Sequence, residues 1–240
     1  MIGDMVKPTL ADTKTNTRRA VRFPAFVENP EFNSWQDGFP EGRRAIFLGS
    51  HSEEFFSVKC PYGQIGDRLW VRETWAGANT EDGPAILYRA NNHRRYLMHE
   101  DAFLEADPTA RGGRCFDYSK TGRVDFSAWA GDLEGEDKGW KPSIHMPRWA
   151  SRITLEIVDI RIERVQDISD EDSMAEGIIH SKWKWDCFET PDGHILYRSP
   201  AQAFKELWDS INSDRGLSWA VNPWAWVIVF KRLPELNLCS

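Results

Sequence analysis

The sequence predicts an α+β protein in which short strands predominate, a few short helices flank them and one large loop-rich insertion interrupts the order. Several short runs alternate apolar and polar side chains, which is the period of a strand. Other segments instead carry apolar residues at three-four spacing, which is typical of a helix. Residues 91–140 lose both periods and gain Gly, Asp and Ser, so they are predicted to be the insertion.

The strands are expected in the alternating runs. These cover residues 45–48, 55–59, 68–75, 85–89, 151–164 and 223–230. The run 68–75 follows turn residues and predicts one strand. The run 151–164 alternates through Ile157 and again from Ile160, which predicts one long strand or two strands joined at a bend. Residues 23–42, rich in Pro, Asn and Gly, predict an ordered loop instead.

Three helices are expected. Residues 4–12 can form a short one that presents Lys14 at its end. Ser169 has the character of an N-cap and Gly177 that of a stop signal, so a short helix is expected between them with Glu176 near its C-terminal end. Residues 200–211 combine an N-terminal Pro with an apolar stripe, which predicts an amphipathic helix.

Length and charge limit the classes of protein to consider. A chain of 240 residues can form one elaborated domain, here with an acidic insertion at about 91–140 and a Trp-rich insertion at about 179–198. The net charge of −7 argues against a protein that holds long nucleic acid through its overall field. Recognition of nucleic acid would have to be local. The acidic insertion is expected to be a solvated flap, or an element that repels duplex DNA.

The sequence offers no sign of a membrane span, a signal peptide or a cofactor site. No apolar stretch reaches the length of a membrane helix, so a cytoplasmic protein is expected. The four cysteines are scattered without ligand spacing, so we expect free thiols, with no metal and no cofactor.

The order of four motifs is the most informative feature. It consists of KTNTRR at 14–19, GDRLWVRE at 66–73, a long strand followed by a helix that ends in Ala-Glu-Gly, and an aromatic C-terminal strand. This order resembles the ASCH domain family of the PUA-like superfamily, in particular the longer proteins of bacteriophages and prophages. The matching pieces cover about a third of the chain.

The resemblance implies a PUA-like mixed β-barrel with flanking helices, related to domains that bind RNA or modified bases. It also implies a reaction, because a short bacterial ASCH enzyme hydrolyses the amide of N4-acetylcytidine with a Lys, a Thr and a Glu. Those positions fall on Lys14, Thr17 and Glu176. Thr17 would attack the acyl carbonyl, Lys14 would act as its base if burial lowered its pKa, and Glu176 would orient or protonate the leaving amine.

Each of these residues also has a structural interpretation. Lys14 and the following arginines can form a solvated basic turn that Thr17 caps. Glu176, just before a helix-ending glycine, can simply lie on the surface.

Further side chains are candidates for substrate binding. Arg19 could hold the oxyanion. Arg68, Arg72 and Glu73 flank the strand that the family places near the pocket, although Glu73 can equally pair with an arginine across the sheet. Arg148 could contact phosphate and Trp149 a base, with packing of the Trp149 ring as the alternative.

Three functions follow. The first is a metal-independent amidohydrolase that removes an acyl group from the exocyclic amine of a cytidine-type substrate. The second is a binding module without chemistry, and the third is a ribonuclease in which Lys14 stabilises phosphate charge. The expected partner is a modified nucleoside or a single-stranded nucleic acid, with no membrane, and the sequence leaves the oligomeric state open.

Overall fold

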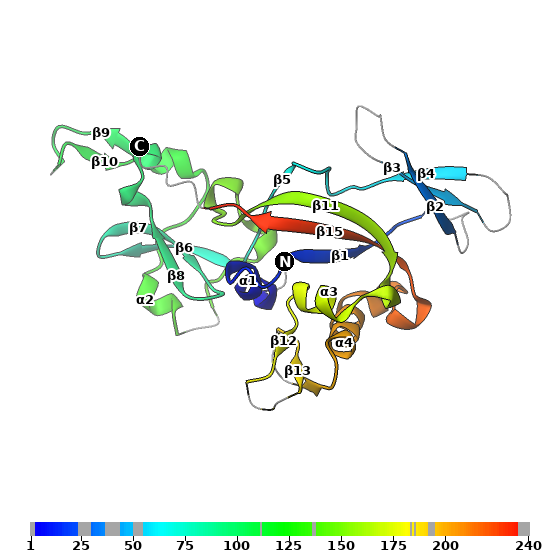
Figure 1. The fold of residues 1–240 in the computed structure, drawn as a ribbon. Coiled ribbons are helices and arrows are strands. Elements are labelled where there is room, and N and C mark those ends of the chain that lie inside the picture. Colours follow the sequence, from blue (N-terminus) through cyan, green and yellow to red (C-terminus); the bar gives the residue numbers. More distant parts are fainter. Residues whose placement is uncertain are drawn as a thin grey trace. The chain divides into compact units, whose positions relative to one another are not determined.

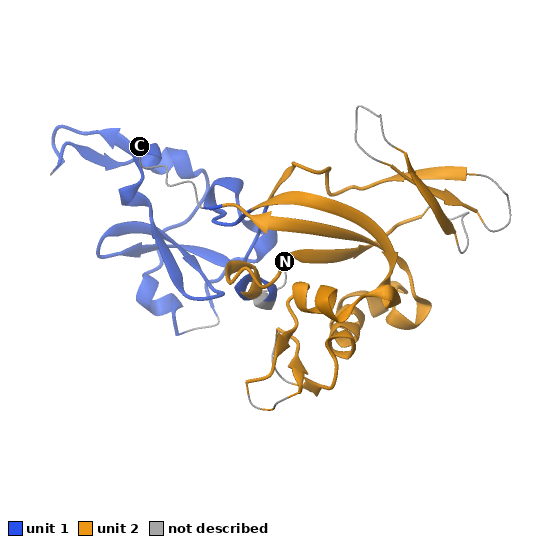
Figure 2. Cartoon of the chain, viewed as in Figure 1, with its two compact units in different colours: residues 1–7, 70–154, 234–240 blue, residues 8–69, 155–233 orange. Residues whose placement is uncertain are grey.

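A computed structural model of the chain describes residues 3–23, 30–36, 44–49, 55–110, 112–135, 138–182, 184, 186–191 and 195–234. It is a mixed α+β protein in which strands are more frequent than helices (Figure 1). The chain forms two compact units, and each is described by itself (Figure 2). Unit 1 contains residues 1–7, 70–154 and 234–240, and unit 2 contains residues 8–69 and 155–233.

A curled four-stranded sheet with strand order β1-β15-β11-β5 is central to unit 2 (Figure 1). Its strands are β1 (Asn16–Ala20), β5 (Arg68–Trp70), β11 (Thr154–Arg164) and β15 (Trp224–Arg232). Both β1 and β11 run antiparallel to β15. The predicted long strand is one strand, and a β-bulge between Ile157 and Asp159 explains why its apolar positions shift there.

The two faces of this sheet differ in character. Paired residues of neighbouring strands share a face, and successive residues alternate between faces. The core face carries Ile160, Ile162, Trp226 and Ile228, which belong to one buried apolar cluster. The opposite face, called the polar face below, carries Asn16 and Arg18 on β1 and Arg161 and Glu163 on β11.

Strands β2 (Glu31–Gln36), β3 (Arg44–Leu48) and β4 (Phe55–Lys59) form an antiparallel meander that contributes Phe47 to the same apolar cluster. The prediction of a loop over residues 23–42 is therefore wrong for 31–36. Phe32 and Trp35 are brought into the core by a register shift between Phe32 and Ser34. That bulge breaks the simple alternation in the sequence, so the strand carries no regular signal. Residues 24–29 and 37–43 lie outside the described part.

Two helices and a small sheet accompany the curled sheet in unit 2. Helix α3 (Asp170–Ala175) begins at the N-cap Ser169, whose side chain accepts from the Asp172 N–H, and α4 (Pro200–Asn212) begins at Ser199. Both confirm the predicted helices. The small sheet consists of β12 (Ile179–His180), β13 (Phe188–Glu189) and β14 (Leu196–Tyr197). Trp183 and Trp185 of the predicted Trp-rich insertion lie outside the described residues.

Unit 1 is built on the antiparallel strands β6 (Trp75–Thr80), β7 (Gly83–Tyr88) and β8 (His93–Tyr96). Strands β9 (Leu104–Ala106) and β10 (Arg114–Phe116) form a hairpin, and α2 spans Ala130–Leu133. The N-terminal helix α1 spans Gly3–Leu10.

Two predictions for unit 1 are corrected. The described part of 91–140 is more than a solvated flap, because Leu97, Phe103 and Phe126 pack into a buried core with Trp75. The single strand predicted over 68–75 is interrupted. Its beginning, β5, belongs to the curled sheet, whereas Trp75 begins β6 and pairs with Tyr88 of β7.

Among the described residues, no helix is long and apolar enough to cross a membrane.

Candidate functional site

The backbone brings Lys14 to the end of α3. The Thr15 N–H donates to the Ala175 carbonyl at 2.9 Å, and the Thr15 carbonyl accepts from the Phe230 N–H at 2.8 Å. The start of β1 is thus fixed between α3 and β15. Lys14 Nζ donates to Glu176 Oε2 and to the Glu176 carbonyl oxygen, each at 2.7 Å. Both residues are only 4% exposed, so the pair is buried.

Gly177 permits this close approach. Its φ of +103° is in the region that favours glycine, and it ends α3 directly after Glu176. A Cβ at this position would lie 3.4 Å from Pro8 Cβ and 3.7 Å from Lys14 Cδ. The Ala-Glu-Gly motif therefore positions Glu176 as well as ending the helix.

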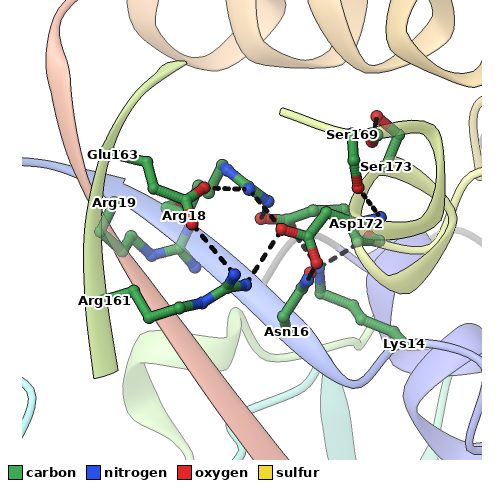
Figure 3. Close-up of polar contacts among 10 residues, drawn as sticks. Lys14, Asn16, Arg18, Arg19, Arg161, Glu163, Ser169, Asp172 and Ser173 are labelled. Carbon is green, nitrogen blue, oxygen red and sulfur yellow. Dashed lines mark hydrogen bonds and ion pairs between the residues drawn. The ribbon is translucent and has the colours of Figure 1, made fainter. Parts of the chain in front are cut away.

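A network of hydrogen bonds and ion pairs extends from this pair across the polar face (Figure 3). Arg18 Nη2 donates to Asp172 Oδ2 at 2.7 Å and to Glu163 Oε2 at 2.8 Å. Arg161 Nη2 also donates to Asp172 Oδ2, at 3.0 Å, and Asn16 Nδ2 donates to Asp172 Oδ1 at 3.2 Å. The name polar cluster is used below for Lys14, Asn16, Arg18, Arg161, Glu163, Asp172 and Glu176.

The polar cluster carries equal numbers of positive and negative charges, and its side chains differ in their exposure to solvent. Its cations are Lys14, Arg18 and Arg161, and its anions are Glu163, Asp172 and Glu176. The Arg18 side chain is 0% exposed, whereas that of Arg161 is 40% exposed. Three charges of each sign already neutralise one another, so the cluster has no surplus positive charge for a phosphate. It is better matched to a neutral polar ligand.

Several buried atoms of the cluster have no hydrogen-bond partner. They are Asn16 Oδ1, Arg18 Nε, Arg18 Nη1, Arg161 Nε and Glu176 Oε1. Arg18 Nη1 and Glu176 Oε1 face each other at 3.9 Å, which is too long for a hydrogen bond. Leaving a buried donor or acceptor unpaired costs about 1–3 kcal/mol, so such atoms usually meet water or a ligand. Their concentration here makes the polar cluster the candidate binding site.

Thr17 and Arg19 do not join the cluster. They alternate with Asn16 and Arg18 along β1 and pair with Ile228 and Trp226 of β15, so they lie on the core face. The expected grouping of Thr17 with Lys14 and Glu176 is therefore corrected. A three-residue separation brings side chains together on a helix but places them on opposite faces of a strand. For Arg19, the described contact is a hydrogen bond from Nη1 to the Arg18 carbonyl at 3.3 Å.

Other candidates have structural partners in unit 1. Glu73 is buried, and its two carboxylate oxygens accept from Arg152 Nε at 2.9 Å and Nη2 at 2.7 Å. This is the structural pair, in which each carboxylate oxygen accepts one hydrogen bond from Arg152. The Trp149 ring packs against the Phe103 ring with centroids 5.2 Å apart, and the backbone carbonyl of Trp149 accepts from Arg95. The ring contact agrees with the packing alternative for Trp149.

Three arginines from the predicted set stay on the surface. Arg72 lies over the Trp70 ring at 4.5 Å and donates to the Ile144 carbonyl at 3.2 Å. Arg68 and Arg148 are exposed.

Sequence reasoning missed Asn16, Arg161, Glu163 and Asp172 as members of the site. A signal was present, because Lys14, Asn16 and Arg18 alternate and would share one face if the motif were a strand. Asp172 could have been found as the third residue after the N-cap Ser169, a position that points an acidic side chain toward the helix start.

Comparisons with known proteins were made at three levels. No family model, curated protein or solved structure matches the chain. The interpretation of the site therefore depends on its own geometry and on the motif resemblance. In the described residues, no three His, Cys, Asp or Glu side chains are grouped as metal ligands would be.

Burial sets the protonation behaviour of the cluster. Desolvation lowers the pKa of Lys14 below its ordinary 10.5, and the neighbouring Glu176 offsets this only in part. Desolvation would raise the pKa of Asp172, but the hydrogen bond and charge of Arg18, with Arg161, bring it below its ordinary value. Lys14 is thus suited to lose a proton and Asp172 to remain ionised.

The lowered pKa of Lys14 makes stability depend on pH. At pH values below 10.5 the unfolded chain holds a proton on Lys14 that the folded chain releases once pH exceeds the lowered pKa. The free energy of unfolding should therefore rise with pH over that window. We expect the stability of wild type relative to Lys14→Met, from urea unfolding, to increase as pH rises toward 10.5. A flat difference would show that the folded-state pKa is not lowered.

Proposed function

We propose that the polar cluster binds the polar edge of a neutral, cytosine-type nucleobase and that the protein removes an acyl group from its exocyclic amine. The observation that carries this proposal is the concentration of unpaired buried donors and acceptors around the Lys14–Glu176 pair. Arg18 Nη1 and Glu176 Oε1 offer a donor beside an acceptor, which suits a base edge. The resemblance to ASCH proteins supports the same substrate class.

The chemistry can proceed with water as the nucleophile, since Thr17 lies on the core face. Neutral Lys14 would take a proton from the water as its oxygen attacks the acyl carbonyl carbon. Arg18 Nη1 would donate to the oxyanion, and Glu176 would hold the exocyclic N–H. Lys14 would then return the proton to the amine nitrogen as the C–N bond breaks, giving a carboxylic acid and the free amine.

Incubation with N4-acetylcytidine tests the proposal, with the loss of the acyl group followed by chromatography. We expect turnover by wild type, a loss of at least about 100-fold in Glu176→Gln and Lys14→Met, and near wild-type turnover in Thr17→Ala. Thr17→Ala is the matched control because Thr17 lies on the same strand but faces the core.

Each variant must be folded, as judged by circular dichroism, before its rate is compared. No turnover of N4-acetylcytidine or related N4-acyl nucleosides by folded wild type would overturn the proposed reaction. A large loss in Thr17→Ala would restore Thr17 as nucleophile and contradict the water mechanism.

A second candidate is a module that binds single-stranded nucleic acid without chemistry. Arg72 favours it, because its guanidinium lies over the Trp70 ring and leaves most of its N–H groups for an outside acceptor. An arginine on an aromatic ring at the surface is a common element of nucleic-acid binding. The balanced charge of the polar cluster gives the third alternative, a ribonuclease that uses Lys14, no comparable support.

The second candidate predicts a salt-dependent affinity. Arg72→Ala should weaken binding of a short single-stranded RNA and reduce the slope of log affinity against log salt by roughly one counterion per lost contact. Arg114→Ala is the matched control, since Arg114 is also exposed but pairs with Asp101. Equal effects of the two variants, measured by fluorescence anisotropy, would rule out a specific role for Arg72.

A further inference from the structure

Asn16 is a member of the polar cluster that can in principle present either a donor or an acceptor to a ligand. It lies on the polar face of β1 between Lys14 and Arg18 and is 2% exposed. A carboxamide normally offers both a donor and an acceptor, and rotation about its last bond can exchange them. The surroundings of Asn16 decide which of the two is presented.

Asp172 fixes the orientation of the Asn16 amide. Asn16 Nδ2 donates to Asp172 Oδ1 at 3.2 Å. If the amide turned over, Asn16 Oδ1 would face this carboxylate oxygen, and two acceptors would repel each other. Only the orientation with Oδ1 directed away from Asp172 remains favourable.

Asp172 is itself held in place from several sides. Its Oδ2 accepts from Arg18 at 2.7 Å and from Arg161 at 3.0 Å. Its backbone N–H donates to Ser169 Oγ at 3.0 Å at the start of α3. Because Asp172 also keeps its negative charge, as its lowered pKa indicates, it continues to select the Nδ2 side of Asn16.

The result is a buried acceptor with nothing to accept. Asn16 Oδ1 has no partner, and Glu176 Oε1 in the same cluster is a second unpaired acceptor. A ligand group that meets Asn16 Oδ1 must therefore be a donor. The free exocyclic amine of the deacylated base has two N–H groups, one for each of these acceptors, whereas a keto oxygen at the same place would leave acceptors in contact.

We infer that Asn16 is a specificity-determining residue that selects bases with an exocyclic amine, such as cytosine, over keto bases, such as uracil. This inference rests on the proposed function, since it names the feature of the substrate that the same site recognises. It concerns binding, so it can be tested with the product-like ligands cytidine and uridine without any turnover.

Titration calorimetry with cytidine and with uridine tests the inference on the full chain. We expect wild type to bind cytidine about tenfold or more tightly than uridine, because a site built for a donor rejects the analogue that lacks it. Asn16→Ala should reduce this preference to about threefold or less, mainly through weaker cytidine binding. Asn212→Ala is the matched control, since Asn212 is also buried in unit 2 but donates to the Trp208 carbonyl.

Asp172→Asn supplies a second test that leaves Asn16 in place. Without the carboxylate the Asn16 amide can turn over, so the variant should bind cytidine and uridine with similar affinity. Equal affinities in wild type, or an unchanged preference in folded Asn16→Ala, would overturn the inference while leaving nucleobase binding intact. If neither cytidine nor uridine binds, the proposed function and this inference are overturned together. If both bind but N4-acetylcytidine is not deacylated, only the proposed reaction is rejected.

Discussion

Replacement of Glu176 by Leu should lower the free energy of unfolding by about 3–5 kcal/mol, because it leaves Lys14 Nζ buried without its carboxylate partner. The carbonyl of residue 176 still accepts from Lys14 Nζ, but one neutral acceptor does not compensate for the loss of a carboxylate at 2.7 Å. Urea unfolding at neutral pH, followed by circular dichroism, measures the change.

The double variant Lys14→Met with Glu176→Leu separates charge from packing. If the single variant is destabilised by an unpaired buried charge, removing both charges should recover most of the loss, since apolar replacements of a buried pair are often tolerated. A cost below about 1 kcal/mol for Glu176→Leu, a value expected of exposed pairs, would mean that the pair is exposed to solvent in the folded protein.

Replacement of Arg18 by Met should cost about 3 kcal/mol, because Arg18 is fully buried and donates to both Asp172 and Glu163. The hydrocarbon part of the new side chain can still pack near Phe204, over whose ring Arg18 lies at 5.9 Å. The loss of stability in Arg18→Met should therefore come mainly from the missing charge and its hydrogen bonds.

Arg161→Met is the matched control for Arg18→Met. It removes the same kind of cation from the same network, and it also breaks a hydrogen bond to Asp172 and an ion pair with Glu163. Because the Arg161 side chain is 40% exposed, water can replace its contacts, and the expected loss is below about 1 kcal/mol. Similar losses for the two variants in urea unfolding would contradict the assigned difference in burial.

Much of the fold could be predicted from local patterns. The helix after Ser169, the amphipathic helix at 200–212 and the long strand ending at Arg164 each carry a cap or a period that the structure confirms. Strand 31–36 could not be predicted, because its bulge interrupts the alternation and its pairing with β3 is a tertiary effect. The separation of β5 from β6 likewise depends on which partner each strand finds. The PUA-like assignment stays a prediction.

The site was predicted in part. The motif resemblance grouped Lys14 with Glu176, and a hydrogen bond joins these two side chains in the structure, although they are 162 positions apart. It misplaced Thr17, since the sequence spacing alone does not say whether the motif is a turn or a strand, and a strand directs Thr17 to the core face. Burial of Glu176 and the role of Asp172 depend on how α3 packs beside β1, which no local pattern contains.

Nuclear magnetic resonance of the side-chain N–H groups of the polar cluster shows directly whether the cluster binds a nucleobase. Cytidine would be titrated into isotope-labelled protein while the Asn16 Nδ2 and Arg18 Nε resonances are followed, with Asn212 Nδ2 as the internal reference. We expect saturable shifts of the Asn16 and Arg18 signals with little change at Asn212. Unchanged Asn16 and Arg18 signals at saturating cytidine would contradict nucleobase binding by the cluster.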